Sequence, residues 1–393
     1  MAKSIHAPVL LLLVIVAASC RKPEKDLAEF APGIAYTNHV AAEKPWSIYI
    51  VRVKRMQRDL ELRSTHAFGT ALGLSTLSDQ IKSLNGAAGN PLAGVNGDFY
   101  QRDRAYAGDP RGLQIIDGEI ISAPMGGAAL WMDADGAPHA ANVQSRFTVT
   151  WPNGATNAFG LNEERSADAM VIYTPAAGGS THTSSNGLEL ILERADSTWL
   201  PLRAGEAYSA RVREVNPRGN TPLTNGVLVL SAGPKLLAKL PAIQTGAVLK
   251  ISTATSPDVR GARTAISGGP LLLREGKRLK IESATGADPT GYSVRSMFEQ
   301  HPRSAIGWNE THIYLVGVDG RQKSSVGMTL KELASYMLEL GCTDAMNLDG
   351  GGSATFWCNG RVVNNPCDKR EREIANALVV TRKTSSTETP TPR

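Results

Sequence analysis

The chain has 393 residues and a formal net charge of +5, with 42% hydrophobic and 20% charged residues. This balance is typical of a globular protein with one large core or two closely packed ones. Lysines and arginines are scattered among acidic residues, without the basic patch and interleaved aromatics that nucleic-acid binding needs, so the sequence predicts no nucleic-acid partner. The 38 glycines and the few aromatic residues favour a turn-rich strand protein over a helical bundle.

The N-terminus indicates export. Lys3 precedes an apolar run, Val9 to Ala18, which is too short for a permanent membrane span but suits the core of a signal peptide. The run ends in Ala17-Ala18-Ser19-Cys20, which resembles a bacterial lipobox. We therefore expect a signal peptide over 1–19, lipidation of Cys20, a tether over 20–33, and a lipoprotein anchored to the membrane of the bacterial cell envelope. A plain secretory signal with an accidental cysteine is the alternative.

The elements that follow are mostly short strands. The β-rich stretch Trp46 to Val53 begins the fold, and Ser75 is expected to cap a helix over 76–84. A buried strand over 94–96 comes next. From 112 to 260, short apolar stretches alternate with turn residues, including an Asp117-Gly118 hairpin. We interpret about 125–260 as a β-rich insertion.

The C-terminal third has the clearest pattern. An amphipathic helix is predicted over 330–340, with Thr329 as its N-cap and Gly341 as its stop. Strands are predicted on both sides of it, over 311–318, 345–348 and 375–381. The predicted fold class is α+β, with mixed β-sheets, a few packing helices and the site at the ends of central strands. The main domain is expected over 34–382 and a disordered tail over 383–393.

Three cysteines follow the lipobox cysteine: Cys342, Cys358 and Cys367. An oxidising compartment permits one disulfide among them. Three pairings are open, and the spacing does not choose between them.

Four loops share one design, in which a strand ends and glycine and polar residues follow. They are Asn96 to Tyr100, Ser267 to Pro270, His301 to Gly307, and Asn347 to Ser353. The fourth holds three consecutive glycines, which cost backbone entropy and add nothing to packing. Such a run is explained if its amides form a nest for an anionic oxygen, with Asp349 at the lip. A tight turn between two strands is the other interpretation.

Metal and nucleotide motifs are missing from the sequence. The seven histidines form no HxxxH or HxH pair, and there is no CxxC, P-loop, GxSxG or GxGxxG. We therefore predict no cofactor and no dedicated metal site, although a divalent cation stays open.

Taken together, six motifs resemble the phosphodiester glycosidase family over residues ~90–381. They are Asn96 to Tyr100, Gly269 to Leu272, Arg303 to Gly307, Val318 to Arg321, Met328 to Leu330, and Asn347 to Ser353. The resemblance implies hydrolysis of the bond between a sugar and a phosphate, on a glycan or glycopolymer phosphodiester. It implies Asp349 and Asp98 as the reacting carboxylates, and Asp319 as a third candidate or an orienting residue. The implied substrate- and phosphate-binding residues are Arg303, Asn96, Asn347, Gly350, Gly351, Gly352, Ser353, Gly269 and Arg321.

Two other functions remain open at this stage. One is a metal-dependent phosphodiesterase that holds Mg²⁺ or Ca²⁺ between Asp98, Asp319 and Asp349. The other is a non-catalytic, glycan-binding surface lipoprotein that keeps the loops as a binding site. The oligomeric state is not indicated by the sequence.

Overall fold

The computed structural model describes residues 27–41, 44–84, 88–102, 106–194, 200–224, 227–281 and 294–384. The expected signal peptide, Cys20 and most of the expected tail lie outside these residues. Strands make up 47% of the structure and helices 9%, so the protein is mainly β and the expected α+β class overstates its helices. No helix in the described part is long and apolar enough to cross a membrane.

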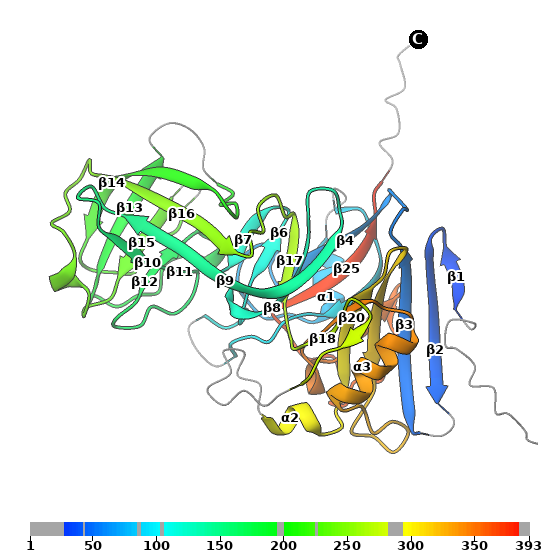
Figure 1. Cartoon of the computed structure of the whole chain (residues 1–393). Helices are drawn as coiled ribbons and strands as arrows, with labels where there is room; N and C mark the ends of the chain where they lie inside the picture. The colour runs from blue at the N-terminus through cyan, green and yellow to red at the C-terminus, as the bar shows by residue number, and fades with distance from the viewer. Residues whose placement is uncertain are drawn as a thin grey trace, which may run out of the picture.

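The described strands form three sheets (Figure 1). The first has eight strands, in the order β1 (Ala28–Ala31), β2 (Ile34–Ala41), β3 (Trp46–Lys54), β21 (His312–Val318), β20 (Arg303–Trp308), β22 (Asp344–Asn347), β18 (Leu271–Arg274) and β19 (Lys277–Arg278). The third has five, in the order β24 (Arg361–Val362), β23 (Phe356–Cys358), β5 (Asn90–Asn96), β25 (Asn376–Arg382) and β4 (Leu60–His66). An apolar core that includes Val51, Val95 and Phe356 lies between these two sheets.

The second sheet has twelve strands and contains the middle of the chain. Its order is β11 (Gly160–Leu161), β12 (Met170–Tyr173), β15 (Leu228–Ala232), β13 (Leu188–Arg194), β14 (Ala207–Asn216), β16 (Val248–Ser256), β9 (Pro138–Thr150), β8 (Met125–Met132), β17 (Thr264–Ser267), β6 (Gln114–Ile116) and β7 (Glu119–Ser122), with β10 (Thr156–Ala158) beside β9. Within the described strands, β11 and β12 form the one parallel pair. The expected mixed sheets are therefore almost entirely antiparallel.

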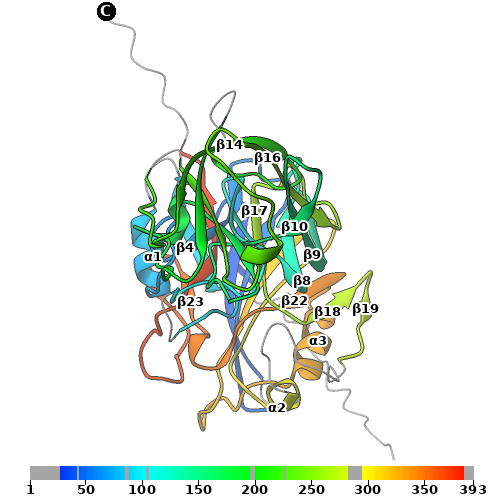
Figure 2. The same cartoon turned by 90° about the vertical axis from the view of Figure 1, so that its left-hand side faces the viewer.

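Strand β9 joins two parts of the molecule. Its first half, 138–144, pairs with β8, and its second half, 144–150, pairs with β16. Figures 1 and 2 show the result, a lobe of strands β10 to β16 that projects from the body of the molecule. The expected β-rich insertion is thus a continuation of a body sheet.

Three α-helices are described: α1 (Leu77–Ser83), α2 (Val294–Phe298) and α3 (Leu330–Glu339). Helix α3 begins as predicted, with a capping box between Thr329 and Glu332. Its apolar face, which includes Leu333 and Met337, packs on the first sheet. Three 3-10 turns are also present: Pro175–Ala177, Leu237–Lys239 and Gly351–Ser353.

Two local expectations are wrong, and one question that the sequence left open is answered. The cap of α1 is Thr76, whose hydroxyl accepts from the Asp79 amide, whereas the Ser75 hydroxyl donates to the Ala67 carbonyl. Residues 28–31 of the expected tether form the edge strand β1, which turns back at Gly33 onto β2. The Cys358 and Cys367 thiols are free, so none of the three disulfide pairings forms in the described part of the chain.

Candidate active site

Two of the four predicted loops meet directly. The Asp349 amide after β22 donates to the Gly97 carbonyl after β5 at 2.9 Å. Asn96 Nδ2 donates to the Asp349 carbonyl at 2.6 Å, while its Oδ1 accepts from the Ser304 hydroxyl and the Thr355 amide at 2.6 and 3.2 Å. Because both ends of the Asn96 amide are bonded to protein, Asn96 fixes the loops to each other.

Asn347 has a similar supporting position. It is fully buried at the end of β22, and its Nδ2 donates to the carbonyls of Gly269 and Leu348 at 2.8 and 2.7 Å. The Gly269 amide donates back to the Asn347 carbonyl at 2.6 Å. Asn347 and Gly269 therefore hold the second loop against the fourth, behind the surface that faces solvent.

Asp98 and Asp349 lie side by side on the joined loops. Asp98 is 3% exposed, and its Oδ1 accepts from the Phe99 amide at 2.8 Å. Its Oδ2 is buried and has no hydrogen-bond partner among the described residues. Asp349 is partly exposed, and its Oδ1 accepts from the Gly350 amide at 2.8 Å. The pair thus consists of one enclosed carboxyl and one that reaches solvent.

Both carboxyls have raised pKa values. Burial raises the pKa of Asp349 to about 6, against the opposing effects of the Ser353 hydroxyl, the Gly350 amide and nearby arginines. Burial raises the pKa of Asp98 well above its ordinary value, and the neighbouring Asp349 charge raises it further. Burial therefore shifts both carboxyls toward the protonated form compared with an aspartate in water.

The exposed side of Asp349 opens into a pocket of about 290 Å³. The residues that line it are Phe99, Ser296, His301, Arg303, Arg321, Asp349, Gly350, Gly351, Gly352 and Arg372. Three arginines around a single carboxylate give this pocket, which we call the arginine pocket, a positive charge that suits an anionic ligand.

Arg303 lines the arginine pocket but is bonded mainly to the backbone. It is 1% exposed, and its guanidinium donates to the carbonyls of Met328, Ser296 and Glu299 at 2.8, 2.6 and 2.9 Å. The guanidinium thus connects the start of β20 with the segment before this strand and with the residue that precedes the cap of α3. Its predicted phosphate contact is secondary to this structural role.

Arg321 is the more accessible cation. Its side chain is exposed, and its Nη2 lies 3.3 Å from Nδ1 of His301. Burial and the charges of Arg303 and Arg321 lower the pKa of His301, so the imidazole is neutral at neutral pH. Arg321 has a left-handed backbone (φ 59°), which turns the chain after β21 toward the pocket.

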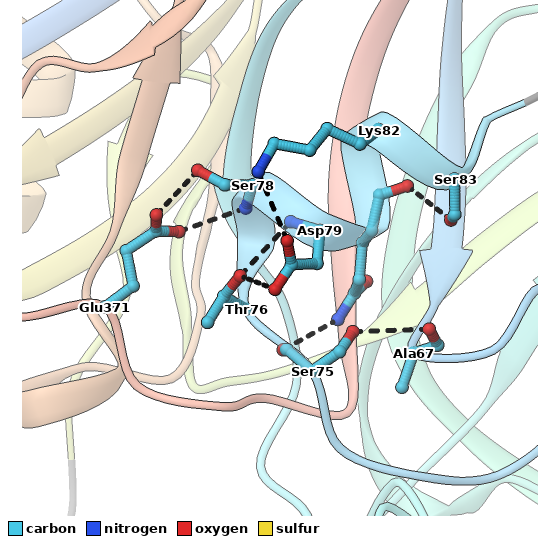
Figure 3. Close-up of polar contacts among 9 residues, drawn as sticks. Ala67, Ser75, Thr76, Ser78, Asp79, Lys82, Ser83 and Glu371 are labelled. Atoms are coloured by element: carbon cyan, nitrogen blue, oxygen red, sulfur yellow. Dashed lines mark hydrogen bonds and ion pairs between the residues drawn. The ribbon is translucent and has the colours of Figure 1, made fainter.

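Arg372 reaches the pocket from a loop that no predicted motif covers. Its Nε and Nη2 donate to Asp368 at 3.1 and 2.6 Å. The preceding residue, Glu371, is held at the N-terminus of α1, where its carboxylate accepts from the Ser78 amide at 3.0 Å and the Ser78 hydroxyl at 2.6 Å (Figure 3). A carboxylate is favoured there because the amides of the first helical turn lack acceptors. Helix α1 therefore positions the loop that carries Arg372.

The glycine loop is closed by protein contacts and is not an open nest. The amides of Gly350, Gly351 and Ser353 donate to Asp349 Oδ1, the Pro302 carbonyl and the Gly350 carbonyl. Of the amides from Gly350 to Ser353, only that of Gly352 has no protein acceptor among the described residues. The glycines are needed for close approach: a Cβ on Gly351 would lie 3.1 Å from Arg321 Nη2, and one on Gly352 would overlap the Arg372 guanidinium.

Asp319 does not join the carboxyl pair, contrary to the sequence hypothesis. It is 4% exposed, and its carboxylate accepts from the Tyr49 hydroxyl at 2.9 Å, the Asn365 amide at 3.0 Å and Asn364 Nδ2 at 3.3 Å. These bonds join the end of β21 to the segment after β24. Asp319 is a structural anchor outside the arginine pocket.

The anchor role gives a testable result. We expect Asp319→Ala to lower the free energy of unfolding by about 2–4 kcal/mol, because one buried donor, the Tyr49 hydroxyl, and two partly buried donors lose their acceptor. Urea unfolding measures this change, with the exposed Asp135→Asn as the matched control. A variant of unchanged stability would show that the hydrogen bonds of Asp319 do not hold the loop.

This placement also bears on the metal-dependent alternative. That mechanism requires Asp98, Asp319 and Asp349 around one ion, but the Asp319 oxygens face Tyr49, Asn364 and Asn365. The described residues contain no group of three or more histidine, cysteine, aspartate or glutamate side chains that could hold a metal ion.

Sequence reasoning missed four of the residues that line the pocket: Phe99, Ser296, His301 and Arg372. His301 belongs to the third predicted loop, so its place beside Arg303 was a usable signal. Arg372 lies in the charged run Asp368 to Glu373, which resembles an ordinary solvated segment. The contacts of Glu371 with α1 and of the Glu373 carbonyl with the Tyr100 hydroxyl show that this run is folded onto the protein.

Fold and site together define a β-protein with a positively charged pocket around a carboxyl pair. Residues 203–381 match the sequence model of the phosphodiester glycosidase family, which confirms the resemblance indicated by the motifs. The match includes the strands and loops that carry Arg303, Arg321 and Asp349. Asp98 lies before the matched range. The resemblance was expected from about residue 90, and the family model matches the later part of that range.

Known proteins with similar sequences support the same family. The chain is 33% identical over 122 residues to the SPbeta prophage-derived uncharacterized protein YomE of Bacillus subtilis (strain 168), over 31% of this chain and 18% of that protein. It is 34% identical over 104 residues to the N-acetylglucosamine-1-phosphodiester alpha-N-acetylglucosaminidase of Bos taurus, over 26% of this chain and 19% of that enzyme. The chain thus covers about a fifth of the length of these relatives.

One solved structure shows the same fold over most of the chain. A hypothetical protein from Synechocystis superposes with a TM-score of 0.73 at 20% sequence identity, over 90% of this chain and 63% of that one.

Proposed function

We propose that the protein is an exported phosphodiester glycosidase, which hydrolyses the bond between the anomeric carbon of a sugar and a phosphate and releases a phosphate monoester. One observation carries the proposal: the partly exposed carboxylate of Asp349 faces a pocket lined by Arg303, Arg321 and Arg372. A sugar-1-phosphodiester presents both of the groups that such a pocket can serve, an anionic phosphate and an electron-deficient anomeric carbon.

The chemistry requires few groups. A phosphate monoester has a second pKa near ~6, so it leaves as an anion with little need of a proton. Arg321 and Arg372 stabilise the negative charge that develops on it, with the Gly352 amide as a further donor. Asp349 then stabilises or attacks the oxocarbenium-like carbon, as a carboxylate does in other glycosidases.

Asp98 has a different role in this proposal. Its carboxyl is enclosed, and burial raises its pKa and thus favours its protonated form, so in this proposal it acts on Asp349 and not on the sugar. A neutral neighbour leaves Asp349 ionised, whereas a second negative charge at that place would favour its protonation. Asp98 is therefore a positioning residue, and Asp349 the reacting carboxylate.

The substrate proposal follows the similar enzyme. N-acetylglucosamine in α-linkage to phosphate is the first sugar to test, because the Bos taurus relative is named for it. A glycan or glycopolymer phosphodiester at the cell surface suits a chain with a signal peptide and a lipidated Cys20, which remain part of the proposal.

Turnover in labelled water tests this function. We expect methyl N-acetylglucosamine-α-1-phosphate to be hydrolysed in H₂¹⁸O with the label in the sugar and with equal rates with and without EDTA. Label in the phosphate, or loss of the rate in EDTA, would establish the metal-dependent phosphodiesterase instead. Tight binding of the diester without turnover would leave a glycan-binding protein.

The pKa of Asp349 predicts the pH dependence of the reaction. Since Asp349 reacts as a carboxylate and its pKa is about 6, kcat/KM should rise about tenfold per pH unit below pH 6 and level above it. A profile with its acidic midpoint near pH 4, the ordinary value for aspartate, would contradict the burial of this carboxyl.

A further inference from the structure

A second pocket, of about 330 Å³, lies behind the loop that carries Asp98. Two short backbone contacts shape this loop as a hairpin: the Arg111 amide donates to the Phe99 carbonyl, and the Gln101 amide to the Asp109 carbonyl, both at 2.9 Å. Phe99 lines the arginine pocket, whereas Asp109 and Arg111 line the second pocket. The hairpin is therefore a wall between the two.

The second pocket lies at the junction of body and lobe. Asp109, Arg111 and Ser122 come from the body, while Glu163 and Arg165 come from the lobe segment after β11. We call it the junction pocket. Its floor includes Tyr106, whose ring stacks on Tyr173 with centroids 5.9 Å apart.

Two polar atoms of the residues that line the junction pocket are buried without a partner in the described part of the chain. One is an acceptor, Asp109 Oδ1, and the other is a donor, Arg165 Nε. Buried polar groups are nearly always hydrogen-bonded in native proteins, so an orphaned acceptor and donor in one pocket indicate a ligand that supplies both partners.

The charges of the junction pocket restrict the ligand further. Asp109, Glu163 and Glu164 line the pocket together with Arg111 and Arg165, so charged groups of both signs are mixed around it. Burial raises the pKa of Asp109 and Glu163, which brings both carboxyls toward the neutral form that donates as well as accepts. Hydroxyl groups have the same double character.

We propose that the junction pocket is a binding subsite for a neutral carbohydrate, whose hydroxyls bond to Asp109, Glu163 and Arg165. An aromatic floor and a rim of carboxyl and guanidinium groups match a ring with an apolar face and polar edges. The inference rests on the proposed function in one respect: it takes this carbohydrate to be the glycan part of the substrate.

The position of the pocket supports that link. Arg111 acts on both sides of the hairpin wall, since its charge lowers the pKa of both Asp98 and Asp109. Asp98 in turn raises the pKa of Asp109. Phe99, next to Asp98, lines the arginine pocket, and Asp109 and Arg111 of the same hairpin line the junction pocket, so the inference takes one extended ligand to reach from one pocket to the other.

Binding of phosphate-free sugars tests the inference independently of turnover. The probes are four neutral methyl α-glycosides, of glucose, mannose, galactose and N-acetylglucosamine, each followed by ligand-observed NMR on the full chain. We expect at least one to bind, and Glu163→Gln and Asp109→Asn each to weaken it by about tenfold. The matched control is Glu214→Gln, which removes an exposed carboxylate from the lobe strand β14.

Each outcome separates this inference from the proposed function. Binding that depends on Glu163 or Asp109, without hydrolysis of any phosphodiester, would uphold the subsite and overturn the glycosidase. Hydrolysis of the diester by the wild type, with binding of the methyl glycosides unchanged in both variants, would uphold the glycosidase and overturn the subsite. Failure of all four glycosides to bind the wild-type chain, or equal binding to both variants, would overturn the subsite as well.

Discussion

Asp349→Asn is expected to lower kcat by about 10³-fold while the fold is retained. The side chain lies at the mouth of the arginine pocket, and its amide and carbonyl, which hold the two loops together, are unchanged by the substitution. An amide cannot supply the negative charge that the developing oxocarbenium ion requires. Because binding of phosphate depends on the arginines, KM should change much less than kcat.

The measurement is steady-state hydrolysis of methyl N-acetylglucosamine-α-1-phosphate by wild type, Asp349→Asn and the control Asp135→Asn, which replaces an exposed aspartate outside the pocket. Asp98→Asn should lose less activity, since Asp98 acts through its neighbour. Activity of Asp349→Asn near the wild-type level would remove Asp349 from the chemistry.

Gly352→Ala should lower kcat/KM by about 10²-fold, although it adds only one methyl group. The new Cβ would overlap the Arg372 guanidinium. The Cβ would also crowd the Asp368 carboxylate, which accepts hydrogen bonds from that guanidinium. The guanidinium must therefore leave the place where it stabilises phosphate. Loss of one such charge-assisted contact in a transition state has an effect of this order.

A double-mutant cycle shows whether the loss acts through Arg372. Arg372→Ala alone should reduce kcat/KM by a similar factor, and the double variant should be little worse than either, because both remove the same interaction. The control is Gly179→Ala, where a Cβ meets nothing within 4 Å. Additive losses would show that Gly352→Ala damages something other than the position of Arg372.

The cap of α3 and the loops at two strand ends were predictable because they depend on neighbours in sequence. The cap of α3 at Thr329 and the loops after β5 and β22 lie where the pattern predicts them. Asp319 and Asp349, by contrast, look alike in sequence, since each follows an apolar strand and precedes glycine. Their difference arises from partners remote in the chain, above all the Tyr49 hydroxyl that binds Asp319.

The predicted α+β class overstated the helix content for a related reason. Short apolar segments of the middle region were correctly taken as strands, but the sequence does not show that they extend one sheet through β9. The glycine loop shows the same limit at the site. Its three glycines indicate that other groups come close to the backbone of this loop. The sequence does not show that these groups include the guanidinium groups of Arg321 and Arg372.

The continuity of β9 has a mechanical consequence. A strand bonded over one half of its length to the body and over the other half to the lobe cannot act as a hinge without breaking its ladder. The spacing between the arginine pocket and the junction pocket is therefore fixed by backbone hydrogen bonds. If one substrate occupies both pockets as proposed, this fixed spacing would select substrates by their length.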